Sequence, residues 1–178
     1  MQWGLIFEDT AVMIPFGKLS RAQRAKLIAV YLYRQIRLMR EFDDHYGEDL
    51  TALFFRGLES AINGGLDRLK GTIDEVEANV PDTEEFSAQE GAYAQNLMIA
   101  LMYLLSYVQA GNDEDLIRCV DSALNNIDLI NYELDENYAE DKVVAREITA
   151  VQNSLSVMAR LDKVSTLESL SDLAVDLI

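Results

Sequence analysis

The feature that most constrains the fold is the run LMIALMYLLSYV at residues 97–108, which Ser106 alone interrupts. A helix needs roughly 17 to 25 apolar residues to cross a bilayer, and polar Asn96 and Gln109 flank this run directly. A helix that is apolar on all sides but too short to span a membrane is normally buried at the centre of a bundle. We therefore predict a central core helix. The side chains expected to be almost fully buried are Leu97, Ile99, Ala100, Leu101, Leu104 and Leu105.

The rest of the chain has the pattern of an all-α protein. Apolar residues recur at three- and four-residue steps, and two prolines and nine glycines in 178 residues favour long helices over short strands. Because the connections are short, consecutive helices should be antiparallel. The expected fold is a single-domain antiparallel bundle of six or seven helices. Their predicted spans are 20–46, 50–62, 66–80, 87–110, 112–134, 144–158 and 165–177.

Several helix starts carry their own signals. Ser20 is a plausible N-cap. Ser87 with Glu90, and Ser165 with Glu168, match the capping box, in which each of two side chains satisfies a backbone N–H at the start of a helix.

The first 17 residues have a different pattern. Trp3, Leu5 and Phe7 occupy alternate positions, as in a β-strand, and a second apolar run ends at Pro15. We interpret residues 1–17 as a short strand pair or a short extended N-terminal arm that packs on the bundle. The bundle domain itself is expected to cover residues 18–178.

The helices predicted over 112–134 and 144–158 carry regular apolar stripes, which run from Leu116 to Leu134 and from Val144 to Met158. Stripes of this kind interdigitate at a shallow crossing angle. We expect these two helices to pack against each other, with the central helix behind them.

The net charge of −16 is unevenly distributed. Residues 81–178 carry a net charge of −14, whereas residues 18–40 contain seven basic side chains and no acidic one. A negative field opposes binding to nucleic acid and to anionic membranes and favours cationic partners, although an acidic surface also serves solubility alone. One cysteine, Cys119, fits a reducing compartment. Since the N-terminus also lacks the pattern of a secretory signal, we expect a cytoplasmic protein.

No catalytic motif is recognisable. The single histidine, His45, lies beside Asp43 and Asp44, and one histidine cannot supply the ligands of a typical zinc or di-iron site. Acidic neighbours raise a thiol pKa, which argues against Cys119 as an activated nucleophile. The carboxylate-rich segment 135–141 lacks the glycine and the spacing of an EF-hand loop. We predict no cofactor, no metal and no enzymatic activity.

The acidic surface of the second half is the remaining candidate site. Carboxylates gather at both ends of the helix predicted over 112–134, roughly 30 Å apart at 1.5 Å per residue. Two tyrosines accompany them, and tyrosine is enriched in protein interfaces, although these two could equally cover the ends of the core. The predicted partner-binding residues are Asp113, Glu114, Asp115, Tyr132, Glu133, Asp135, Glu136, Tyr138, Glu140 and Asp141.

Three stretches resemble the bacterial domain-of-unknown-function family 416. They are HYGEDLTALFFRGLESAI (45–62), LDRLKGTIDEVEANVPDTEEF (66–86) and YAQNLMIALMYLLSYVQAGNDEDLIRCVDSALNNID (93–128), and the turn at 80–86 is the most specific part. The resemblance covers about residues 18–161.

Two positions depart from the pattern of that family. Asn96 stands where many members have aspartate, and Tyr93-Ala94 replaces the usual Tyr-Pro step. The resemblance implies an all-helical fold and no established reaction.

Three functions are compatible with these observations. Small acidic helical proteins also occur among the immunity genes beside secreted bacterial toxins. We therefore favour a cytoplasmic immunity protein, or antitoxin, that binds and neutralises a cationic toxin domain as a monomer or weak homodimer. The alternatives are a housekeeping helical protein with a protein-binding role and an enzyme with a cryptic carboxylate site.

Overall fold

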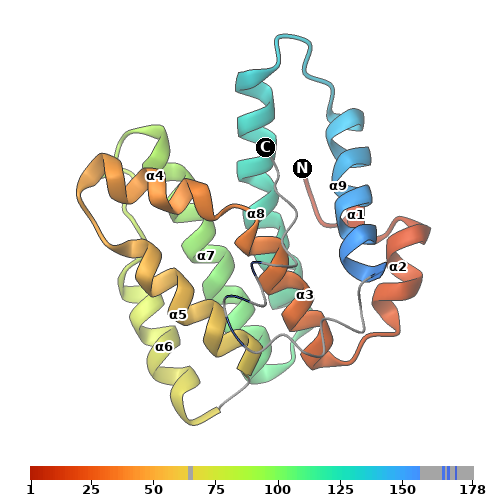
Figure 1. Ribbon diagram of the computed structural model, residues 1–178, viewed down its shortest axis with the longest axis horizontal. Helices are drawn as coiled ribbons and strands as arrows, with labels where there is room; N and C mark the ends of the chain where they lie inside the picture. Colours follow the sequence, from red (N-terminus) through yellow and green to blue (C-terminus); the bar gives the residue numbers. More distant parts are fainter. Residues whose placement is uncertain (64–65, 157–165, 167, 169–170, 172–178) are drawn as a thin grey trace.

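The computed structural model describes residues 1–63 and 66–156 and the single positions 166, 168 and 171. Over these residues the chain forms nine helices and no strand (Figure 1), which confirms the all-α fold class. The helices are α1 (Gly4–Phe7), α2 (Thr10–Gly17), α3 (Arg21–Tyr33), α4 (Ile36–Tyr46), α5 (Leu50–Asn63), α6 (Leu66–Ala78), α7 (Gln89–Ala110), α8 (Asp113–Leu134) and α9 (Glu140–Ser156). Apart from the three single positions, the helix predicted over 165–177 lies outside the described residues.

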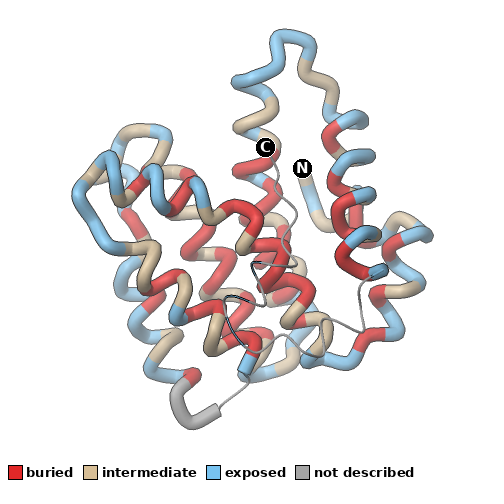
Figure 2. Tube along the Cα trace, in the orientation of Figure 1, coloured by how far each residue is buried: buried red, intermediate tan, exposed pale blue. Residues whose placement is uncertain are grey.

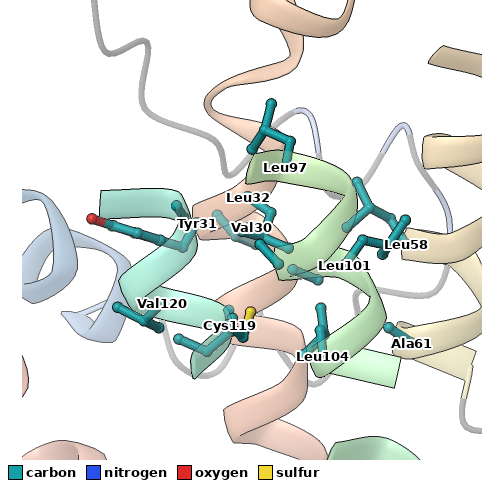
Figure 3. Packing of buried hydrophobic residues seen from close by; sticks show 14 of the residues in the cluster. Val30, Tyr31, Leu32, Leu58, Ala61, Leu97, Leu101, Leu104, Cys119 and Val120 are labelled. Carbon is teal, nitrogen blue, oxygen red and sulfur yellow. The ribbon is translucent and has the colours of Figure 1, made fainter. Parts of the chain in front are cut away.

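Helix α7 is the centre of the molecule, as the apolar run predicts. It packs against α3, α4, α5, α6 and α8, and Figure 3 shows Leu101 between Leu58 of α5 and Cys119 of α8. Five of the six side chains expected to be buried are fully buried, whereas Ile99 is only half-buried and Met98 takes its place in the core. None of the helices described here is long and apolar enough to cross a membrane.

The extended N-terminal arm is a wrong prediction, because residues 1–17 contain helices α1 and α2. The Asp9 carboxylate accepts a hydrogen bond from the Ala11 N–H at 2.9 Å and so caps the start of α2. Trp3 and Phe7, four residues apart, share one face of α1 and stack with ring centroids 4.1 Å apart, while Leu5 is 45% exposed. Trp3 and Phe7 therefore have the four-residue spacing of neighbours on a helix. Leu5, which completed the strand-like alternation, is on the exposed side.

The helix predicted over 20–46 is also interrupted. Its start is as expected, because Ser20 and Gln23 form a full capping box. At Arg34 and Gln35 the chain bends, however, and a separate helix α4 begins at Ile36. The bend turns both side chains toward other helices: Arg34 contacts α9, and the Gln35 amide donates to the Ala123 carbonyl of α8 at 3.1 Å.

The capping box predicted at Ser87 and Glu90 is not formed. Helix α7 instead begins at Gln89, with Ala88 as an N-cap that makes no side-chain cap hydrogen bond. The Ala88 N–H donates to the Tyr46 hydroxyl oxygen at 2.9 Å. The preceding turn folds so tightly over the helix that a Cβ atom at Gly91 would lie 2.0 Å from the Phe86 carbonyl oxygen.

This close approach predicts opposite effects for two glycine-to-alanine substitutions in helices. Gly91→Ala should lower the free energy of unfolding by about 3 kcal/mol, because the obstructing atom belongs to the backbone and cannot rotate away. Gly71→Ala in α6, where a Cβ meets nothing within 4 Å, should raise it by about 0.5 to 1 kcal/mol through helix propensity. Urea denaturation of both variants measures the difference, and equal effects would contradict the packing described here.

Helices α8 and α9 do not pack along their whole lengths, contrary to the prediction from their stripes. Helix α8 packs chiefly on α7, and α9 packs on α1, α2 and α3 with only light contact to α8. The reason is that α1 and α2 supply an apolar surface, with Ile6, Phe7 and Val12 all buried, that covers the inner face of α9. The two helices thus lie side by side without close packing, and the loop joins them at one end (Figure 1).

Candidate protein-binding surface

The last turns of α8 leave the core although its apolar stripe continues. Along that stripe Leu116, Val120 and Ile127 are buried, but Ile130 is half-buried and Leu134 is 74% exposed. Figure 2 shows the same change, from buried residues in the lower part of α8 to exposed ones in its upper end and in the loop to α9. Nothing in the described part of the chain covers this end of the stripe.

We call residues 129–141 the α8–α9 tip. Its exposed apolar and aromatic side chains are Leu129, Tyr132 and Leu134, of which Tyr132 is 68% exposed. Five exposed carboxylates surround them, and within the described residues none of the five forms an ion pair. These are Glu133, Asp135, Glu136, Glu140 and Asp141. Apolar side chains ringed by unpaired acids suit a cationic protein surface.

Local contacts give the tip a defined shape. The Tyr138 hydroxyl donates to the Asp128 carboxylate, and its ring meets Tyr132 edge to face at a centroid distance of 5.7 Å. The hydrogen bond to Asp128 is the main reason that the pKa of Tyr138 is raised to about 12. Glu133 accepts a hydrogen bond from the Tyr93 hydroxyl at 2.9 Å, which ties the tip to α7.

The other three predicted acids do not belong to this surface. Asp113, Glu114 and Asp115 lie at the opposite end of α8, and two of them have basic partners. Asp113 is 3.6 Å from Arg24, and Glu114 is 3.6 Å from Arg118. The structure therefore divides the ten predicted partner-binding residues into two groups. These three acids lie at one end of α8, and the other seven residues belong to the tip at its other end.

The basic residues of α3 contact the protein's own helices. Besides pairing with Asp113, the Arg24 guanidinium lies over the Phe16 ring at 5.2 Å. Arg21 donates to the carbonyl oxygen of Tyr107 at 2.9 Å and to that of Val108, and so satisfies acceptors in the last turn of α7. Basic side chains of the first half thus neutralise helix ends and acids of the second half.

A buried polar cluster inside the bundle was not predicted. The Glu147 carboxylate is fully buried in α9 and accepts hydrogen bonds from the Tyr31 hydroxyl at 2.9 Å and from Arg34 at 3.2 Å, both through Oε2. Burial, followed by the charge of Glu147, raises the pKa of Tyr31. The signal in the sequence is the spacing Val143, Glu147, Val151, which places an acid at the middle of an apolar face.

The remaining candidates for chemistry lie apart from the tip. Cys119 is fully buried, and burial raises the pKa of its thiol, rather than the acidic neighbours that the sequence suggested. His45 is exposed in the last turn of α4. Within the described residues, no group of three or more histidine, cysteine or acidic side chains is placed to hold a metal ion.

Comparison with known proteins supports the fold. Neither family models nor curated protein sequences give a match to this sequence. Among solved structures, the chain is similar to a DUF416 family protein from Shewanella baltica, with a TM-score of 0.66 and 18% sequence identity over 90% of this chain and 89% of that one. The chain therefore shares the fold of a protein from the domain-of-unknown-function family that its sequence resembles.

Proposed function

We propose that this chain is a cytoplasmic immunity protein that neutralises a cationic bacterial toxin domain by binding it at the α8–α9 tip. The observation that carries the proposal is the end of the α8 stripe, where Leu134 and Tyr132 are exposed beside five carboxylates that form no ion pair within the described residues. Toxins that act on nucleic acids or nucleotides present cationic surfaces to their substrates, and such a surface complements an acidic tip.

The two kinds of side chain in the tip have different roles in this proposal. The carboxylates attract the partner from a distance, which mainly accelerates association and weakens as salt screens the charges. Exposed Leu129, Tyr132 and Leu134 become buried in the complex and supply most of the affinity, as large anchors do in protein interfaces. Because the Tyr132 ring already packs on Tyr138, little ordering of this anchor is needed on binding.

Charge reversal of the tip tests the role of the carboxylates. The probe is the toxin domain that, on this proposal, is encoded beside the gene for this chain. We expect the variant with lysine at Asp135, Glu136, Glu140 and Asp141 to associate about tenfold more slowly or worse at low salt, and to lose protection of cells that produce the toxin. Biolayer interferometry and a growth assay measure the two effects.

The matched control changes the total charge by the same amount at another place. Lysine at Asp74, Glu77, Glu84 and Glu85, all exposed and far along the chain from the tip, should leave association and protection nearly unchanged. Circular dichroism establishes that both variants are folded. Equal behaviour of the tip variant and the wild type, or equal losses in the two variants, would contradict a specific role for the tip.

A further inference from the structure

Helices α4, α8 and α9 enclose a pocket of about 300 Å³ next to the bend between α3 and α4. Its lining is unexpected in a chain with a net charge of −16, because the described residues that line it include three arginines and no acid. The arginines are Arg34, Arg37 and Arg146, one each from the bend, α4 and α9. The volume lies at the lower end of the range for small-molecule sites, which is roughly 300 to 1,000 Å³.

The apolar and cationic parts of the pocket lie at different depths. Leu38 and Ile127 are buried and Ile130 is half-buried, so these side chains form an aliphatic floor. Arg37 and Arg146 are exposed and therefore lie at the mouth. An aliphatic floor below a cationic mouth fits a ligand that has an apolar body and an anionic end.

The polar side chains of the pocket differ in their hydrogen-bond and ion-pair partners. Arg37 pairs with Glu41 at 3.2 Å, but Arg146 donates to the neutral amide oxygen of Asn131 and has no carboxylate partner among the described residues. The charge of Arg146 is thus available to an anion. On the inner wall, the Oε1 atom of Gln35 is buried and accepts no hydrogen bond from the described part of the protein, while its amide donates to α8.

We propose that this pocket binds a medium-chain aliphatic carboxylate. The carboxylate accepts charge-assisted hydrogen bonds from Arg146 and Arg37 at the mouth. The aliphatic chain covers Leu38 and Ile127.

Titration calorimetry of the 178-residue chain at low salt compares two probes, octanoate and octan-1-ol. Octanoate should bind more tightly, because octan-1-ol lacks the carboxylate that Arg146 and Arg37 bind in this proposal. Methyl NMR spectra should show ligand-induced shifts at Leu38, Ile127 and Ile130. Octan-1-ol binding as tightly as octanoate, or no shift of these methyl groups with any probe, would overturn the proposal.

A double variant tests the cationic mouth on exposed side chains. Arg37→Gln with Arg146→Gln should weaken octanoate binding by about tenfold, because it removes two charge-assisted contacts that exposed side chains make through solvent-screened charges, and should leave octan-1-ol binding unchanged. The control, Arg40→Gln with Arg118→Gln, removes the same charge from exposed positions outside the pocket. Octanoate binding that falls equally in both variants would reflect overall charge and contradict the assigned site.

Discussion

Replacing Glu147 with alanine is expected to lower the free energy of unfolding by about 3 to 5 kcal/mol. The carboxylate is fully buried and is the shared acceptor for Tyr31 and Arg34. Its removal breaks the buried ion pair with Arg34, whose side chain is only 2% exposed and whose guanidinium lies 3.2 Å from the carboxylate. Urea denaturation followed by circular dichroism measures the change.

A triple variant separates two quantities: the stability lost when the buried pair is broken, and the contribution of the intact polar cluster to the free energy of unfolding. Tyr31→Phe, Arg34→Met and Glu147→Leu together replace the three polar side chains of the cluster with apolar ones and keep most of the volume. A buried ion pair replaced as a whole by apolar side chains is often neutral or stabilising, so the triple variant should be more stable than Glu147→Ala. A triple variant as unstable as the single one would show that the pair is stabilising in its own right.

The second large effect is expected at the centre of the bundle. Leu101→Ala should lower the free energy of unfolding by about 2 to 5 kcal/mol, because a fully buried leucine leaves a cavity that rigid neighbours cannot fill. Figure 3 shows the neighbours: Leu58 and Ala61 on α5 lie to one side of Leu101, and α8 lies to the other. The same denaturation experiment measures this loss.

Gly57 on α5 provides a matched test of that cavity. A Cβ atom at Gly57 would lie 2.5 Å from a terminal methyl carbon of Leu101, so Gly57→Ala should destabilise the wild type. In the Leu101→Ala background the obstructing methyl is gone, and the same substitution should stabilise by filling space and favouring helix. An effect of the same sign in both backgrounds would contradict the packing of α5 on α7.

The sequence predicts most of the secondary structure because the helices of the bundle are long and strongly patterned. The run at 97–108 identifies the central helix, and its burial follows from length and composition alone. The errors occur where tertiary contacts override local pattern. Helix α1 forms where its segment packs against α2 and α9, and at the bend near Gln35 that side chain donates to the backbone of α8.

The candidate site was predictable in part. Composition and spacing identified acids at both ends of α8, but they do not indicate which group has basic partners, since Arg24 approaches Asp113 from a distant part of the chain. The sequence also does not reveal that Leu134 is exposed, because its position in the apolar stripe is that of a core residue. The end of the stripe is exposed because α9 packs chiefly on α1, α2 and α3 and does not cover the last turns of α8.

The most direct test of the account is amide hydrogen exchange of the 178-residue chain with and without the cationic toxin domain that we propose as its partner. If the α8–α9 tip is the docking surface, the toxin slows exchange in residues 129–141 and leaves α6 and the start of α8 at Asp113 unchanged. Protection of α6 or of the Asp113 end, with no change across 129–141, would contradict the central claim that this protein binds its partner at the tip.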